Sequence, residues 1–183
     1  MTSQQADATL STTSRRRNST VRTLRTLHHW IQTAGESPVP WRIATVVARL
    51  ALAAAFLSAV ADRFGLWGEF GTGSVAWGTF DAFETNTAAL APYLSGWAVD
   101  AVAVAATVAE LALGIALLIG VALRWTAWLC VGLLLFFGLS MAVFVDVQAP
   151  LKFAVFSGLA AALMLALAPR GSLVLVVDRR LSV

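Results

Sequence analysis

Three ionisable side chains in long apolar runs are the residues most able to do chemistry, Arg49, Arg63 and Glu110. A charged group at membrane depth is costly unless it is paired or reaches water, so each marks a buried ion pair or a binding site. At a rise of about 1.5 Å per residue, the distance from the arginine-rich, inner end of each apolar run is ~10 Å for Arg49, ~20 Å for Glu110 and ~30 Å for Arg63. Side chains lean toward the amino terminus of their helix, so between antiparallel helices Arg63 and Glu110 converge and Arg49 diverges. We therefore predict a buried contact between Arg63 and Glu110.

Residue spacing supports the same pairing. Arg49, Phe56 and Arg63 recur every seven residues and share one helix face. A stripe of mostly small residues surrounds the acid in the later run, Ala103, Ala106, Thr107, Glu110 and Gly114. Two interpretations of the pair remain open, a structural pair that fixes how the helices align or a polar group of a binding site. Arg49 has a simpler alternative, because a long side chain so near the surface can extend its charge into water.

The elements that position these residues follow from composition. The chain has 183 residues, 58% hydrophobic and 13% charged, with a mean hydropathy of +0.77. This is more apolar surface than a soluble domain of that length buries. Apolar runs near the ~20 residues that a helix needs to cross a bilayer cover 42–61, 98–123, 125–145 and 151–168. We expect an all-α bundle of four transmembrane helices, with an aromatic-rich outer loop between the first and second.

The arginine distribution predicts the orientation. Ten arginines fall on one side if the amino end is cytoplasmic, Arg15, Arg16, Arg17, Arg22, Arg25, Arg42, Arg124, Arg170, Arg179 and Arg180. Only Arg63 and Lys152 fall at the outer ends. The expected location is the inner (plasma) membrane, with both termini in the cytoplasm. Residues 1–41 form a cytoplasmic leader, disordered to about residue 18 and then either an amphipathic surface helix or a frayed one over 19–32, and residues 169–183 form a cytoplasmic tail.

Several classes of function are excluded by the residues present. Cys130 is the one cysteine, so an intramolecular disulfide, a paired-cysteine redox site and a cysteine zinc cluster are not available. His28 and His29 both fall in the polar leader, where they cannot hold a haem within the bilayer. The arginines sit mostly in the tails, so a nucleic-acid partner is not expected despite a formal charge of +3. Neither metal nor haem ligands are visible, and any redox role requires a borrowed cofactor.

A family resemblance rests on motifs spread over about residues 42–168. These are Ala48–Ala51, Phe56–Ala59, Asp62–Gly68, Val75–Phe80, Glu110–Gly120, Ala149–Leu151 and Val155–Ser157. In these segments the chain resembles DoxX-like membrane proteins, a family related to a membrane subunit of thiosulfate:quinone oxidoreductase. The resemblance implies a four-helix membrane protein, with an acidic residue and often tyrosine after Pro150 and Leu151. Here Lys152 and Phe153 stand in those places, which reverses a charge beside the outer loop.

Two functions compete. In the first, the protein is an accessory or quinone-interacting membrane subunit of a redox system, without independent catalysis. Its slot for the ring would be formed by Trp67, Trp77, Phe80, Tyr93 and Lys152. In the second, it is a scaffold or small transporter-like protein in which the Glu110 pair serves only packing. The expected partners are the lipid bilayer and either redox-complex subunits or further copies of the chain.

The orientation can be tested by cysteine labelling. A cysteine placed at Ser11 or Ser182 should not react with an impermeant reagent in intact cells, because both positions are expected in the cytoplasm. A cysteine within residues 64–97 should react. Labelling at either terminal position would reverse the orientation.

Overall fold

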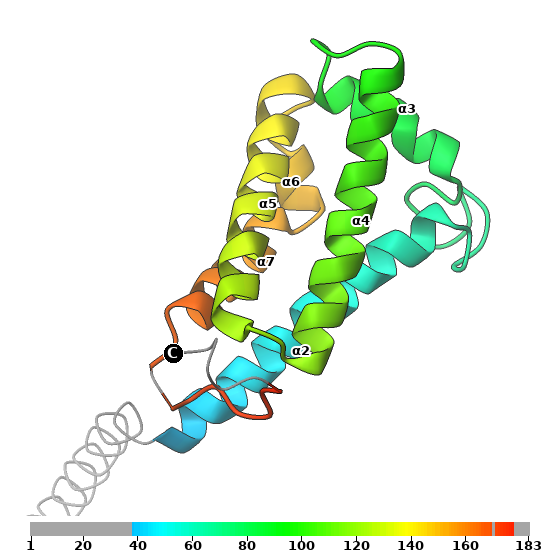
Figure 1. Ribbon diagram of the computed structural model, residues 1–183. Coiled ribbons are helices and arrows are strands. Elements are labelled where there is room, and N and C mark those ends of the chain that lie inside the picture. The colour runs from blue at the N-terminus through cyan, green and yellow to red at the C-terminus, as the bar shows by residue number, and fades with distance from the viewer. Residues whose placement is uncertain (1–37, 170, 178–183) are drawn as a thin grey trace, which may run out of the picture. The chain divides into compact units, whose positions relative to one another are not determined.

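The computed structural model describes residues 38–169 and 171–177, and every regular element in this part is a helix. The helices are α2 (Pro38–Arg63), α3 (Phe80–Leu90), α4 (Trp97–Ile119), α5 (Leu123–Phe144), α6 (Ala149–Lys152) and α7 (Val155–Ala166) (Figure 1). Contacts divide the chain into units 1–41 and 42–183. In the first unit only the residues that begin α2 are described. The predictions for the leader before residue 38 and for the tail after residue 177 lie outside the described residues.

Three of the described helices are long and apolar enough to cross a membrane. They are Val39–Arg63, Trp97–Ile119 and Leu123–Phe144, with 25, 23 and 22 residues, so the shortest extends about 33 Å. Large apolar side chains remain exposed along them, including Val47, Val108 and Leu129, each about 60% exposed. A water-soluble chain would cover such surface, whereas hydrocarbon solvates it. The all-α prediction is confirmed, and these three helices are compatible with a membrane protein.

The last predicted membrane helix, over 151–168, is not continuous. Its residues form α6 and α7, separated at Phe153 and Ala154. The backbone N–H of Phe153 donates to the carbonyls of Ala149 and Leu151, and Ala154 takes the left-handed conformation with φ of 54°. A helix cannot continue through such a residue. The 12 residues of α7 extend only about 18 Å, less than the ~30 Å hydrocarbon core.

The predicted outer loop also contains regular structure. Residues 80–90 form α3. Thr79 caps its amino end, because the Thr79 hydroxyl accepts a hydrogen bond from the backbone N–H of Ala82. This helix packs against α4 and α5. Phe83 and Thr87 on its inner face are buried. The aromatic residues of this segment therefore contribute to the packed interior as well as to the surface.

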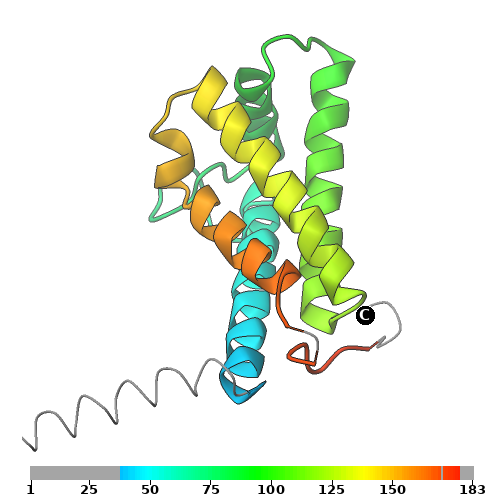
Figure 2. The same cartoon turned by 90° about the vertical axis from the view of Figure 1, so that its left-hand side faces the viewer.

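A packed core holds α2, α4, α5 and α7 together. Figure 2 shows α7 lying beside α5. The core consists of Leu52, Ala53, Phe56, Leu117, Leu123, Ala127, Cys130, Ala162, Leu165 and Ala166. Gly114 allows close approach of α2 and α4, because a Cβ there would lie 3.0 Å from the Leu57 side chain. Four of the five residues of the stripe predicted from sequence, Ala103, Thr107, Glu110 and Gly114, are buried in α4, and Ala106 is half-buried.

The segment after α7 folds back over one end of these helices, and we call residues 171–177 the C-terminal strap. Thr45 Oγ1 donates to the Ser172 carbonyl at 3.0 Å. Arg49 Nη1 donates to the carbonyls of Val174 and Leu175 at 3.2 and 3.1 Å. Arg49 is only 5% exposed, so it binds the strap instead of extending into water. The Val177 N–H completes the contact by donating to the Gly120 carbonyl.

Replacement of Gly120 tests the packing of the strap. Gly120 has φ of +83°, and a Cβ there would lie 2.6 Å from the Leu175 carbonyl oxygen and 3.0 Å from Arg49 Nη1. Gly120→Ala should therefore cost about 2–4 kcal/mol, the sum of a left-handed alanine and displacement of the strap. The measurement is thermal unfolding in detergent.

Gly171→Ala is the matched control for this prediction. Gly171 has φ of +88° but no atom within 4 Å of the added Cβ, so its loss should be only the conformational cost of about 1–2 kcal/mol. Equal losses in the two variants would contradict a close contact between the strap and Gly120.

Candidate functional site

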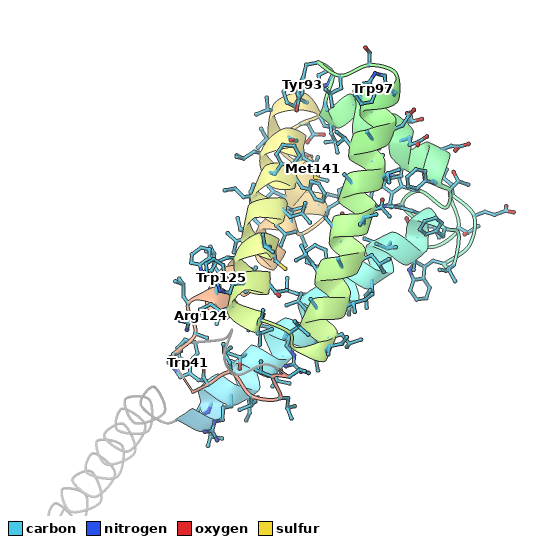
Figure 3. The ribbon with its side chains drawn as sticks, in the orientation of Figure 1. Trp41, Tyr93, Trp97, Arg124, Trp125 and Met141 are labelled. Carbon is cyan, nitrogen blue, oxygen red and sulfur yellow. The ribbon has the colours of Figure 1, made fainter. Side chains whose placement is uncertain are left out.

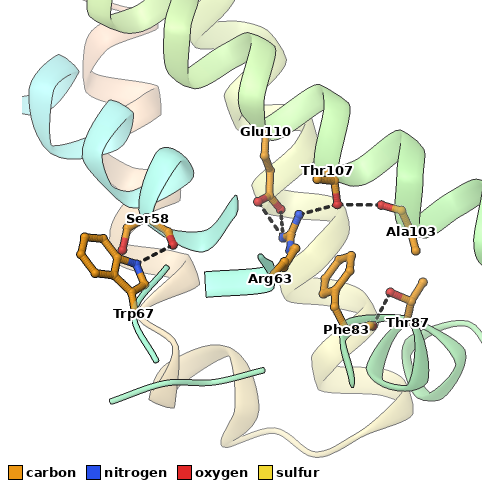
Figure 4. A network of polar contacts seen from close by, with 8 residues as sticks. All are labelled: Ser58, Arg63, Trp67, Phe83, Thr87, Ala103, Thr107 and Glu110. Carbon is orange, nitrogen blue, oxygen red and sulfur yellow. Dashed lines mark hydrogen bonds and ion pairs between the residues drawn. The ribbon is translucent and has the colours of Figure 1, made fainter. Parts of the chain in front are cut away.

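The predicted contact between Arg63 and Glu110 is present. Arg63 Nη2 donates to Glu110 Oε1 at 2.8 Å and to Oε2 at 2.7 Å, joining the end of α2 to the middle of α4 (Figure 4). The two side chains are 2% and 3% exposed. Burial of such a pair is tolerated because the charges neutralise each other at hydrogen-bonding distance. The ion pair therefore gives the site polar groups without adding a net charge.

Neighbouring side chains fix the orientation of the guanidinium. Arg63 Nη1 donates to Thr107 Oγ1 at 2.8 Å, and that hydroxyl donates onward to the Ala103 carbonyl at 2.9 Å. The Phe83 ring lies against the flat face of the group, with Arg63 Cζ 3.7 Å from the ring centroid. Stacking of this kind adds a cation–π attraction in a desolvated setting. Figure 4 shows Arg63 enclosed by Glu110, Thr107 and Phe83.

A cavity of about 250 Å³ lies beside the pair. Its walls come from α2, α3, α4, α5 and α7, from the segments on either side of α3, and from the junction of α6 with α7. Most of its lining is apolar, including Phe56, Phe137 and Met141. The uncharged polar side chains on its wall are Asn86, Thr87, Tyr93 and Ser140. An apolar cavity with a few hydrogen-bonding groups is the usual form of a small-molecule site.

Figure 3 shows where Tyr93, one of the cavity-lining residues, lies in the bundle. Tyr93 lies at the end of α4 and α5 that is opposite Arg124. Arg124 belongs to the other end, where its Nη2 donates to the Ala168 carbonyl at 2.7 Å. Tyr93, which lines the cavity, is 65% exposed.

Asp62 positions the loop that closes the cavity. Its carboxylate is buried and accepts the backbone N–H of Trp77 at 2.9 Å and that of Ala76 at 3.2 Å. The following Gly78 has φ of +71°, and a Cβ there would lie 2.8 Å from the Phe70 nitrogen. The backbone around Trp77 is thus held by a carboxylate on one side and a tight glycine turn on the other. The indole of Trp77 packs edge-on against Phe83 with the centroids 5.3 Å apart.

The predicted slot residues separate into two groups. Trp77 and Tyr93 line the cavity. Trp67 is 60% exposed and its indole N–H donates to the Ser58 carbonyl, while Phe80 stacks on Phe64 outside the lining. Lys152 is an exposed residue at the end of α6 and also lies outside the lining. The structure therefore does not bring these five residues together in one slot.

Some site residues were not singled out from the sequence. Asp62 enters the sequence analysis only as the start of the motif Asp62–Gly68, and Phe153 only as a departure from the family pattern. The signal for Asp62 was its position directly before Arg63 at the end of an apolar run, which places an acid where a turn needs an acceptor. Phe153 gave no usable signal, because its place on the cavity wall depends on the break between α6 and α7.

Within residues 38–169 and 171–177, no group of three or more His, Cys, Asp or Glu side chains is arranged to hold a metal ion. Comparisons of the chain with protein-family models, curated proteins and solved structures gave no match.

The pair is testable by a double-mutant cycle on unfolding in detergent. Glu110→Gln leaves a buried guanidinium without its counter-charge and should cost about 2–4 kcal/mol, and Arg63→Gln should cost a similar amount. The double variant should recover much of the loss, because two amides can bond to each other and no charge is stranded. Additive losses would mean that the two charges are not energetically coupled.

Proposed function

We propose that the chain is an integral protein of the inner (plasma) membrane with both termini in the cytoplasm. The three long apolar helices α2, α4 and α5 support this proposal, as do their exposed apolar faces. The α6–α7 segment provides the remaining passage as a broken helix. Non-helical backbone at such depth is tolerated where it is buried in protein or lines a cavity, and Phe153 and Ala154 at the break line the cavity. The end with Arg49 and Arg124 would face the cytoplasm.

We propose further that the cavity binds the ring of a quinone, and that the protein serves a redox system as an accessory subunit. The observation that carries this proposal is an apolar cavity with a neutralised ion pair on its wall. A neutral cavity favours an uncharged ligand over an ionic one, since a single charge would have no counter-charge there. Its volume of about 250 Å³ lies just below the roughly 300–1,000 Å³ of most small-molecule sites, so it would hold a ring while the attached chain stays outside.

Hydrogen bonding to the ring oxygens is available from the wall. Asn86 and Ser140 offer an amide and a hydroxyl, and Tyr93 offers a phenol at the outer end. The pair itself is less suited to contact, because Arg63 already donates to Glu110 and Thr107. Its contribution would be to fix α2 against α4 and so to keep the cavity open between them.

An accessory role agrees with the residues present. Among the described residues that line the cavity, no nucleophile lies beside a base. Electrons would have to come from a partner subunit, and the resemblance to DoxX-like proteins supports such a partnership. The competing function is a scaffold in which the cavity stays without a ligand.

Filling the cavity tests this function. Ala106 lies on the cavity wall, so Ala106→Phe should lower the affinity for a decyl-substituted benzoquinone at least about tenfold, by occupying the space of the ring. Binding is measured by equilibrium titration of the purified full chain in nanodiscs.

Ala105→Phe provides the matched control. Ala105 is the preceding residue of α4, is exposed and does not line the cavity, so its affinity should equal that of the wild type. Absence of saturable binding by the wild type would reject the quinone proposal and favour the scaffold.

A further inference from the structure

We infer that Trp77 and Phe153 recognise the ligand by stacking against its planar ring. This inference rests on the proposed function and adds the part of the cavity that selects one shape of ligand. Neither residue belongs to the ion pair, and the two come from segments far apart in the chain. We call them the ring pair.

The geometry of the ring pair differs from that of the other aromatic contacts at the cavity. The ring planes of Trp77 and Phe153 are parallel to within 6°, and the centroids lie 6.2 Å apart. Both side chains line the cavity. Trp77 meets Phe83 edge-on at 81°, and Phe83 meets Phe80 at 53°. The two rings stack on each other, and a flat ligand can extend such a parallel stack on its open side.

The backbone on the Trp77 side is fixed by hydrogen bonds. The Asp62 carboxylate accepts the Trp77 N–H at 2.9 Å and is only 6% exposed. An acceptor so buried holds its donor firmly, because neither group can turn to water instead. The Arg63 guanidinium lies 5.6 Å from the indole centroid and supports that ring from the interior. Asp62 is thus a positioning residue for Trp77.

The backbone on the Phe153 side is fixed by the break between α6 and α7. Phe153 directly follows the last residue of α6, and the left-handed Ala154 comes next with φ of 54°. A left-handed alanine is unfavourable, and such conformations gather at functional sites. In an uninterrupted helix Phe153 would follow the helical rotation and lose its parallel alignment with Trp77. The break between α6 and α7 thus brings Phe153 to the cavity wall.

The test compares two ligands with one tail, a decyl-substituted benzoquinone with a planar ring and a decyl-substituted cyclohexanedione with a puckered ring. Trp77→Leu and Phe153→Leu should each lower the affinity for the planar ligand about fivefold, since a stacking contact is lost. Affinity for the puckered ligand should change little, so the preference for the planar ring should largely disappear. Titrations use the full chain in nanodiscs.

Two kinds of variant control for folding. Trp67→Leu removes an exposed indole outside the cavity lining and should leave both affinities unchanged. Trp77→Phe and Phe153→Tyr keep a planar ring and should retain the preference. Quenching of tryptophan fluorescence by the benzoquinone gives a second readout. Trp77→Phe should remove part of the quenching, whereas Trp67→Phe should leave the quenching unchanged.

The outcomes separate the two proposals. If the leucine variants bind the planar ligand as the wild type does while Ala106→Phe still blocks binding, the ring pair does not recognise the ligand and the quinone proposal stands. If the leucine variants weaken both ligands equally, the ring pair acts only in packing and the inference is overturned. If the wild type binds neither ligand, the proposed function and the inference fall together.

Discussion

The ion pair between Arg63 and Glu110 is the constraint on which the rest of the site depends. Neither charge could remain in so buried a place alone, so α2 and α4 must meet at one register, and small residues such as Gly114 permit that approach. The same pairing places Arg63 beneath Phe83 and Trp77. One electrostatic requirement therefore sets the helix spacing and the position of the aromatic residues above it.

The cavity follows from this arrangement. The pair holds two helices together at one point, and α3 and the α6–α7 junction supply the remaining walls. Because the charges of Arg63 and Glu110 cancel, the cavity has polar groups on its wall and can still accept an uncharged molecule. The hydrogen bond between Asp62 and the Trp77 N–H and the left-handed conformation of Ala154 then bring the rings of Trp77 and Phe153 to that space.

How much the sequence could predict depends on the kind of signal. Glu110 and Arg63 were predictable as a pair, because the lean of side chains on antiparallel helices is a general property of helix geometry. The three long helices were predictable from apolar length. The break at Ala154 was not, since hydropathy measures transfer into lipid and is insensitive to one residue with positive φ. Asp62 was only weakly signalled by its position before Arg63, because its partners are backbone groups, which any sequence would supply.

The contacts of the C-terminal strap bear on the order in which the chain is completed. Arg49 is made long before the carbonyls that it binds, which lie 125 and 126 positions later. Until those carbonyls are made, the guanidinium lacks these two partners and must take others. Docking of the strap joins this end of α2 to a segment that follows α7. Within the described residues, the helix that is made first is thus secured at this end only by the segment that is made last.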